Sequence, residues 1–339
     1  MSRLSPNAVY YRAALAAVAA AYLAACSDAP TEPSKGAPSV SSDVSQSVNG
    51  FTRHILPTRE LANQAKPSNG AAGGGTGIFY HGGPVLLATK VVSVYWAGSP
   101  IYNGGPSTGS GSGSQDGSLV GAFLRGLGGS PYFNINTTYT DGSGTHISNS
   151  VTYSGYWANA TSAPGSGASV SDAQMVSMLQ SGFNSGAITY DPSTLYAIFT
   201  AKGVNLGGGF GSKYCAYHTN GTVTINGVSK TVLYAAMPYN MTYPANCSAN
   251  LSVWPNGDPG ADAEVNTLAH ETEETTTDML GTAWWDRRGY ENADKCAWKW
   301  GTTYSTSNGS TANVSIGGKN WLVQMNWVNS GSGGCLNKL

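Results

Sequence analysis

Residues 263–278, AEVNTLAHETEETTTD, form the stretch on which the predicted architecture depends, because they predict a helix that carries metal-type ligands. In a helix, His270 and Glu274 project from one face about one turn apart, close enough to share an ion. Glu271 would lie beside that ion, where a general base that deprotonates water is needed. The pattern H-E-x-x-E differs in one residue from H-E-x-x-H, in which two histidines on one helix face bind zinc.

The same stretch has a simpler interpretation, a solvated acidic helix face that carries a structural histidine. Glu264, Glu273 and Asp278 add to its acidic character, and H-E-x-x-E is a short pattern. Only 10% of the chain is charged, however, and much of its acid is gathered here. This concentration favours a metal site.

A hydrolytic zinc site needs a third protein ligand and a position for water. Glu291 and Asp294 lie three residues apart, so one could bind the ion while the other orients His270. A helix rises about 1.5 Å per residue, which places Asp278 about 12 Å along the axis from His270, at the helix end. His218 is a further candidate from a neighbouring strand. The alternative is that both carboxylates pair with nearby cations, namely Arg287, Arg288 or Lys295.

The composition indicates the class of protein more clearly than its partners. The 339 residues carry a net charge of −1, and without a basic excess no nucleic-acid partner is predicted. The chain contains 45 Gly and is 10% aromatic. This composition is typical of an extracellular, turn-rich protein that contains strands.

The N-terminus resembles a bacterial lipoprotein signal peptide. Arg3 and Arg12 precede an almost wholly apolar run, residues 13–25, which is too short for a membrane span. We expect residues 1–25 to be removed and Cys26 to be acylated, so that lipid tethers the exported protein to the cell envelope, in the outer membrane, the periplasm or at the surface. An ordinary secretory signal with an incidental cysteine is the alternative.

The other four cysteines are an even number in an oxidising compartment, so two disulfides are expected. Three pairings are possible. Cys215 with Cys247 and Cys296 with Cys335 is favoured because it closes the shorter loops. A zinc site made of all four thiolates is the rival interpretation, but no C-x-x-C pair supports it.

The chain divides into a signal, a tether and one folded domain. Residues 26–76 are rich in Ser, Pro, Ala and Gly and are expected to be a flexible tether. Residues 77–339 are expected to form a single α/β domain, mixed α+β, with a mixed sheet, two or three helices and a C-terminal hairpin region. This order resembles the zincin catalytic domain, in which the metal-binding helix follows a mixed sheet.

Local patterns place the elements of that domain. Helices are predicted at residues 118–127 and after Ser171, an N-cap with Gln174 three residues on. The second of these helices buries methionines. Strands are predicted at residues 85–87, 90–96, 147–157 and 194–200, with a loop at 102–117 and hairpins around Asn226-Gly227 and Gly317-Gly318.

An ordered set of short motifs runs from residue 77 to residue 335. The set comprises Tyr80-His81-Gly82-Gly83-Pro84-Val85-Leu86, Trp96, Gly98, Cys215 with His218, Asn256-Gly257-Asp258 with Gly260 and Asp262, Ala269-His270-Glu271 with Glu274, and Ala293-Asp294 with Cys296. Together these motifs resemble the exordium, or phosphate-induced protein, family of plants and microbes. The resemblance implies an extracellular protein linked to cell expansion and the wall, and it assigns no reaction. Plant members carry more cysteines around the Cys215 and Cys247 regions, so their bridge pattern is not transferred whole. They also have a plain secretory signal, whereas the lipoprotein-like signal here implies a tethered envelope protein.

Two functions are compatible with these patterns. The first is a metal-dependent hydrolase of peptide or other amide bonds in extracellular or cell-wall material. Its Zn²⁺ would be held by His270, Glu274 and either Glu291 or Asp294, with Glu271 as base. Calcium or a structural ion would also suit such acidic ligands. The second is a non-catalytic cell-wall or carbohydrate-binding module, with a structural metal or none. Its candidate aromatic residues are Trp284, Trp285, Trp298, Trp300, Trp321 and Trp327.

Overall fold

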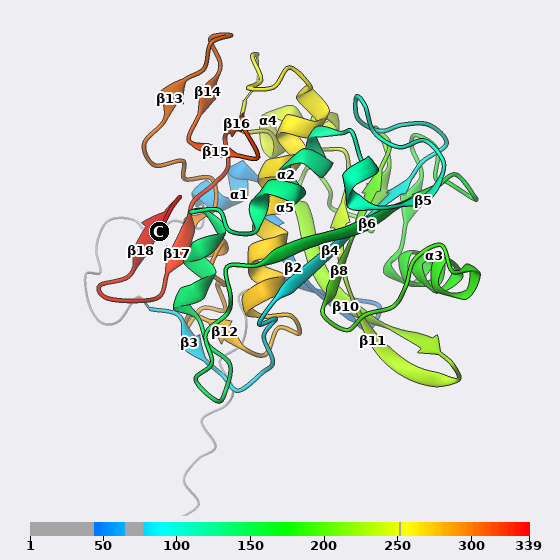
Figure 1. Ribbon diagram of the computed structural model, residues 1–339, viewed down its shortest axis with the longest axis horizontal. Coiled ribbons are helices and arrows are strands. Elements are labelled where there is room, and N and C mark those ends of the chain that lie inside the picture. Colours follow the sequence, from blue (N-terminus) through cyan, green and yellow to red (C-terminus); the bar gives the residue numbers. More distant parts are fainter. Residues whose placement is uncertain (1–43, 65–76, 251) are drawn as a thin grey trace, which may run out of the picture. The chain divides into compact units, whose positions relative to one another are not determined.

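An eight-stranded mixed sheet forms the centre of the fold in the computed structural model, which describes residues 44–64, 77–250 and 252–339 (Figure 1). In sheet order its strands are β1 Ser45–Val48, β2 Phe51–Pro57, β10 Tyr214–Ile225, β11 Val228–Met237, β8 Thr194–Thr200, β4 Thr89–Trp96, β6 Val151–Asn159 and β5 Gly109–Gly111. β11, β8, β4 and β6 are parallel, whereas the pairs that involve β1, β2, β5 and the β10–β11 hairpin are antiparallel. The mixed α/β class predicted from the sequence is confirmed.

Strand β8 shows how the sheet divides the core into two layers. All seven of its residues are buried. Tyr196 and Ile198 belong to one apolar cluster, whereas Ala197 and Phe199 belong to another. Because successive side chains of a strand point to opposite faces, each cluster fills one side of the sheet. A strand covered on both faces has a continuous apolar sequence, which is why its pattern predicted it.

Three main helices cover these faces. α3, Asp172–Ser185, packs Met175 and Met178 into the cluster that contains Tyr196. α2, Leu119–Leu127, and α5, Pro259–Thr277, pack against each other on the opposite face (Figure 1). The short helical segments are α1 Arg59–Gln64, η2 Gly113–Gln115, η3 Phe133–Thr138, η4 Asn240–Thr242, α4 Pro244–Cys247 and η5 Asp294–Cys296.

Local sequence signals fix the ends of several elements. Ser118 caps α2, and Ser171 caps α3 with the predicted capping box. Asn226 and Gly227 join β10 to β11 with φ values of 51° and 76°. Both values are positive, as the two-residue turn that suits a twisted hairpin requires.

The remaining strands form small two-stranded ladders, several of them in the C-terminal third. Their bounds are β3 Phe79–Tyr80, β7 Ser169–Val170, β9 Asn205–Leu206, β12 Trp284–Trp285, β13 Tyr304–Ser305, β14 Thr311–Ala312, β15 Val314–Ile316, β16 Lys319–Trp321, β17 Asn326–Val328 and β18 Gly334–Leu336. β15 and β16 flank Gly317 and Gly318, which confirms the predicted last hairpin. None of the helices in the described part of the chain has both the length and the apolar character that crossing a bilayer requires.

Two disulfides link segments that are distant in the sequence. Cys215 is bonded to Cys247, and Cys296 is bonded to Cys335. This is the pairing that the sequence favoured, so the thiolate zinc site is excluded. Disulfides indicate an oxidising, extracellular compartment.

The predicted tether is wrong for part of its length. Residues 45–64 form β1, β2 and α1, and β2 pairs with β10 inside the main sheet. The sequence of β2 places Arg53 and His54 at buried positions, so it shows neither an apolar run nor alternation. The remainder of the predicted tether, the signal segment and Cys26 lie outside the described residues.

Three smaller expectations also change. Residues 85–87 do not form a strand, and the next strand, β4, begins at Thr89. The strand predicted from residue 147 begins at Val151. The predicted loop at residues 102–117 contains the short edge strand β5 and the turn η2.

Candidate metal centre

Helix α5 places a polar sequence inside the protein. It begins after Asp258, whose carboxylate accepts hydrogen bonds from the backbone N–H groups of Gly260 and Ala261, and it has Pro259 in its first turn. Every residue from Gly260 to Thr277 is buried. The solvated acidic face considered above is therefore wrong, because the helix is covered on all sides.

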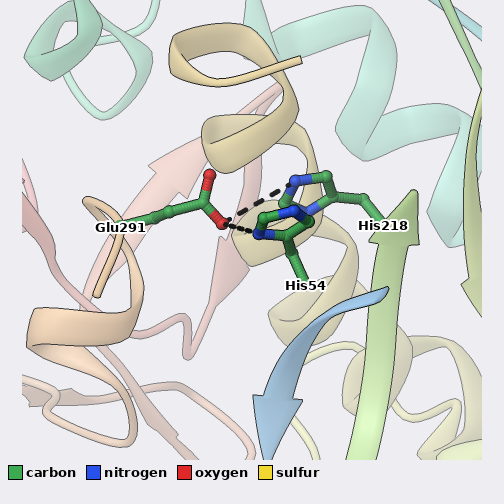
Figure 2. A group of neighbouring side chains, drawn as sticks. All are labelled: His54, His218 and Glu291. Atoms are coloured by element: carbon green, nitrogen blue, oxygen red, sulfur yellow. Dashed lines mark ion pairs between the residues drawn. The ribbon is translucent and has the colours of Figure 1, made fainter. Parts of the chain in front are cut away.

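The sheet presents two histidines to this helix. His54 on β2 and His218 on β10 are direct partners in the antiparallel register, and their rings stack with centroids 5.0 Å apart. Glu291, from the segment that follows α5, points at both rings (Figure 2). Its Oε2 lies 3.2 Å from Nδ1 of His54 and 3.7 Å from Nε2 of His218.

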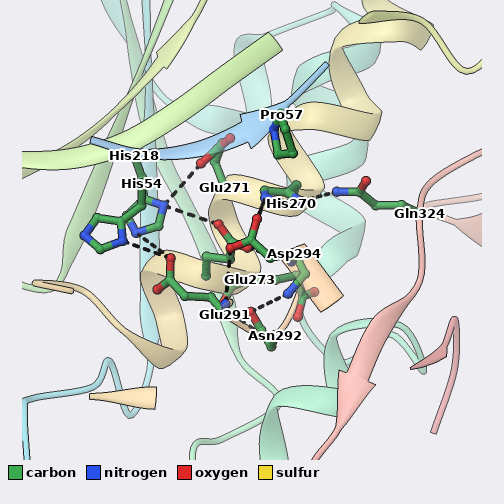
Figure 3. A network of polar contacts seen from close by, with 12 residues as sticks. His54, Pro57, His218, His270, Glu271, Glu273, Glu291, Asn292, Asp294 and Gln324 are labelled. Carbon is green, nitrogen blue, oxygen red and sulfur yellow. Dashed lines mark hydrogen bonds and ion pairs between the residues drawn. The ribbon is translucent and has the colours of Figure 1, made fainter. Parts of the chain in front are cut away.

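Helix α5 supplies His270 and Glu274 to a second group, and η5 supplies Asp294 (Figure 3). Nε2 of His270 lies 3.0 Å from Oε1 of Glu274 and 3.5 Å from Oδ1 of Asp294. The backbone N–H of Asp294 donates to Oε1 of Glu274 over 2.9 Å. The side-chain amide of Gln324 hydrogen-bonds Nδ1 of His270, so Nε2 is the ring nitrogen that faces the carboxylates.

Glu271 and Glu274 connect the two groups. Oε2 of Glu271 lies 3.2 Å from Nδ1 of His218, and Oε2 of Glu274 lies 3.7 Å from the same nitrogen. Glu274 thus directs one oxygen to His270 and the other to His218. Helical spacing places both glutamates next to His270, as the motif predicted.

Burial makes negative charge costly at this cluster. It raises the pKa of Glu271 and Glu291 well above the ordinary value, and neighbouring carboxylates raise both further. Burial and the proximity of Asp294 raise the pKa of Glu274 to about 8. The pKa of Asp294 is also raised, mainly by burial. The interior therefore opposes ionisation of these carboxyls unless positive charge lies beside them.

The histidines respond differently to the same interior. Burial lowers the pKa of His54 to about 4, and burial together with His54 and His270 lowers the pKa of His218 well below its ordinary value. Burial opposes charge on His270 as well, but Glu274 and Asp294 outweigh it and raise its pKa. His54 and His218 are therefore neutral imidazoles, the form that binds metal ions.

Several buried side-chain nitrogen and oxygen atoms lack hydrogen-bond partners, although buried polar groups are nearly always satisfied. They are Nε2 of His218, Nε2 of His270, Oε1 of Glu271, Oε2 of Glu274, both carboxylate oxygens of Glu291 and Oδ1 of Asp294. The ion-pair partners of the four carboxylates are histidines. This donor set of imidazole nitrogens and carboxylate oxygens is suited to a divalent cation.

The geometry agrees with metal coordination. Ligand atoms around a tetrahedral zinc ion, each about 2.0–2.2 Å from it, are about 3.3 Å from one another. His270, Glu274 and Asp294 offer atoms that all lie within 4.8 Å of one another, and so do His54, His218 and Glu291. A third group of this kind is formed by His218, Glu271 and Glu274.

The two candidates for the third ligand lie in different groups of side chains. Asp294 joins His270, whereas Glu291 joins His54 and His218. Asp278 ends the helix, where its Oδ1 accepts the backbone N–H groups of Thr282 and Ala283. The alternative that Glu291 and Asp294 pair with nearby cations is wrong, because Lys295 and Arg288 both pair with Asp286.

His54 is the functional candidate that the sequence did not reveal. It lies in the stretch expected to be a tether, and nothing in its neighbours resembles a ligand motif. Only the register of β2 against β10, which sets it opposite His218, brings it to the cluster. Of the remaining histidines, His81 stacks on Trp285 and His146 is exposed.

The tryptophans that suggested a sugar-binding face serve mainly the interior. Trp298 and Trp321 are buried in the two apolar clusters. The indole N–H of Trp284 donates to the carbonyl of Thr140. Trp284, Trp285, Trp300 and Trp327 are half-buried, so they do not form an exposed aromatic platform.

Comparison with known proteins identifies one related family. Residues 129–319, more than half of the chain, match the sequence model described as the phosphate-induced protein 1 conserved region. The matched segment includes His218, His270, Glu274 and Asp294, whereas His54 precedes it. No curated protein and no solved structure matches the chain.

Proposed function

We propose that this chain, which belongs to the phosphate-induced protein 1 (exordium) family, is a metal-dependent hydrolase. The family resemblance assigns no reaction, so the proposal is drawn from the buried cluster of histidines and carboxylates. His270, Glu274 and Asp294 would hold a zinc-type ion. The observation that carries this proposal is the imbalance of charge, four buried carboxylates whose ion-pair partners are histidines. A bound divalent cation would neutralise them and occupy the unpartnered atoms.

The reaction that these residues suit best is hydrolysis of a peptide or other amide bond. A zinc-type ion in such a site acts as a Lewis acid. Glu271 is next to His270 on the helix and has one unpartnered oxygen, Oε1, that can accept a proton from water. The helix motif and the preceding mixed sheet resemble a zincin catalytic domain, which supports the same reaction. Peptide material outside the cell or in its wall is the proposed substrate.

A second function, a structural metal in a non-catalytic wall protein, is favoured by the enclosure of the cluster. His270, Glu271 and Glu274 have no exposed surface. The loop after α5 lies so close to His54 that a Cβ on Gly281 would be 2.2 Å from its Nε2. Because Glu271 is fully buried, substrate reaches it only if the surrounding structure moves, whereas a structural ion needs no such motion.

Metal analysis tests the site that both functions share. The protein is purified without chelators and equilibrated with zinc. The His270→Ala variant should then contain less zinc per chain than the unaltered protein. His146→Ala, which changes an exposed histidine, is the matched control. Equal zinc contents in the protein and in His270→Ala, or no zinc in either, would reject the site.

A second variant separates hydrolysis from a structural role. Glu271→Gln keeps the shape of the side chain but removes the base, so the zinc at His270 should be retained while amide hydrolysis of a mixed peptide substrate falls by roughly 100-fold or more. If the unaltered protein hydrolyses no peptide but loses its folded structure with a chelator, the structural function is the correct one.

Export and anchoring complete the proposal. The disulfides agree with an oxidising compartment, and the lipoprotein-like N-terminus would place the mature chain in the envelope with acylated Cys26 at its start. Replacing Cys26 with Ser should release the protein from the membrane fraction and prevent processing. Unchanged fractionation and processing would contradict lipidation.

A further inference from the structure

We propose that His54, His218 and Glu291 form a second metal site, separate from the one at His270, that takes a zinc-type divalent ion. The proposal goes beyond the function above and does not require the ion at His270. It rests on the convergence of three buried side chains from three elements, namely β2, β10 and the segment after α5 (Figure 2).

The separations are of the size that ligand atoms around a shared ion have. Oε2 of Glu291 is 3.2 Å from Nδ1 of His54 and 3.7 Å from Nε2 of His218, and all three atoms lie within 4.8 Å of one another. Tetrahedral zinc requires separations of about 3.3 Å between ligand atoms. The stacked rings, inclined by 16°, direct one nitrogen each toward the same carboxylate oxygen.

The site is built into rigid parts of the fold. His54 and His218 are fixed by the strand register, and the side chains of His218 and Glu291 are each 1% exposed. Nε2 of His218 has no hydrogen-bond partner, and the carboxyl of Asp278 is a further acidic group beside the Glu291 carboxylate. Buried polar atoms of this kind are rare without a ligand, because burial deprives them of their hydrogen bonds with water.

Glu271 orients one of the ligands. Its Oε2 lies 3.2 Å from Nδ1 of His218, where it can accept the proton of that nitrogen and leave the lone pair of Nε2 facing Glu291. A carboxylate that holds the outer nitrogen of a ligating histidine is the usual support of such sites. Glu271 is thus a positioning residue for this second site, in addition to its proposed role as base through Oε1.

The ligand types predict which ion binds. Two imidazoles and one carboxylate form the set that holds catalytic zinc in several hydrolases, whereas calcium prefers oxygen ligands alone. The group at His270 contributes one nitrogen and two carboxylates. Calcium should therefore compete with zinc more strongly at His270 than at His54.

The stoichiometry of zinc binding tests the proposal. The purified protein is equilibrated with zinc, separated from free ion and analysed for zinc per chain, beside His54→Gln, Glu291→Gln and the exposed control His81→Ala. We expect two ions in the protein and in His81→Ala, and one in His54→Gln and in Glu291→Gln. Near-ultraviolet circular dichroism checks the fold of each variant, and Glu291→Gln replaces His54→Gln if the latter unfolds.

The remaining outcomes separate this site from the proposed function. His270→Ala should lose one ion and keep the one at His54. Fewer than two ions in the unaltered protein would overturn the second site, unless the single ion survives in His270→Ala and is lost in His54→Gln, which would reject the site at His270 instead. Two ions in His54→Gln and Glu291→Gln, both folded, would also overturn it.

Discussion

Two adjacent residues of β2, Arg53 and His54, lead into two buried charged clusters on opposite faces of the sheet. Arg53 points toward α3 and pairs with Asp172 at the start of that helix. His54 points toward α5 and the histidine–carboxylate cluster. The alternation of side chains along a strand separates the two environments. In the cluster at Arg53, the charges balance within the protein. In the cluster at His54, the carboxyl groups outnumber the cations beside them.

The cluster on the α3 side shows how this fold satisfies a buried charge with its own residues. Nε of Arg53 donates to Oδ2 of Asp172 over 2.9 Å, and Nη1 donates to the carbonyl of Gly207 over 2.8 Å. The hydroxyls of Tyr217 and Tyr234 both donate to Oδ1 of Asp172. One positive charge meets one negative charge. In the part of the chain that the structure describes, no lysine or arginine forms an ion pair with Glu271, Glu274, Glu291 or Asp294, so these carboxyls lack the counter-charge that Asp172 has.

The largest expected effect on stability comes from removing the cation Arg53 on the α3 side. Arg53→Met leaves the Asp172 carboxylate buried without a counter-charge, which should lower the free energy of unfolding by about 3–5 kcal/mol. The loss should be the same with and without a chelator, because Arg53 itself is the cation that pairs with Asp172. Urea unfolding followed by tryptophan fluorescence measures it.

Lys90→Met is the matched control for this prediction. Lys90 pairs with Asp191 across 2.7 Å, but the two side chains are 45% and 34% exposed. Water screens such a pair, so its removal should cost less than about 1 kcal/mol. Equal losses in the two variants would show that the buried pair has no special importance.

Removal of metal should have the next largest effect, and only on the α5 side. With free zinc at about 100 times its Kd, one site adds about 2.7 kcal/mol to the free energy of unfolding. A chelator should abolish this increment in the unaltered protein, and His270→Ala should have a smaller one. Arg53→Met, if it folds, should keep the full increment. The midpoint of thermal unfolding with and without zinc provides the measurement, and an increment that His270→Ala leaves unchanged would contradict the assignment.

Glu264 allows the effect of burial on a carboxyl to be measured away from the candidate ligands. It lies on α5, is fully buried and accepts a hydrogen bond from the backbone N–H of Asn240. Burial raises its pKa from 4.5 to about 8. A group whose folded pKa is raised stabilises the fold fully below its unfolded pKa, and this contribution is lost as pH rises through the folded pKa.

The unaltered protein should therefore lose stability between about pH 4.5 and 8, by on the order of 1 kcal/mol per pH unit from this group. Glu264→Gln, which keeps the shape but cannot ionise, should be similar in stability at pH 5 and more stable at pH 9. Urea unfolding across that range in the presence of chelator measures the difference. Glu60→Gln, at an exposed position, is the control, and parallel pH profiles for the unaltered protein and Glu264→Gln would refute the expectation.

Sequence patterns located the fold where local signals were strong. The apolar run of β8, the capping box at Ser171 and the Asn226-Gly227 turn each depend on neighbours in the chain, and each is confirmed. β2 was missed because its buried positions hold Arg53 and His54, whose partners are distant in the sequence. Short-range patterns cannot reveal a strand whose polar side chains are satisfied only after the sheet forms.

The same distinction applies to the candidate site. The spacing of His270, Glu271 and Glu274 follows from helix geometry, so the sequence contains it directly. Asp294 was one of two possible partners, and the structure places it beside His270 while Glu291 turns to the strands. The position of His54 depends on the pairing of β2 with β10, which no motif encodes.

The smallest expected effect concerns the start of α3 and tests whether the two faces are independent. The hydroxyl of Ser171 accepts a hydrogen bond from the backbone N–H of Gln174, and Oε1 of Gln174 accepts one from the backbone N–H of Ser171. Ser171→Ala should lower the free energy of unfolding by about 1 kcal/mol, since it leaves a helix N–H without its cap. Ser181→Ala, at an exposed position inside the same helix, should cost little because alanine favours the helix. Both variants should bind the same amount of zinc as the unaltered protein, because α3 and the cluster on α5 are separated by the sheet. A loss of zinc in Ser171→Ala alone would show that the start of α3 and the histidine cluster are coupled through β2, where Arg53 and His54 are neighbours.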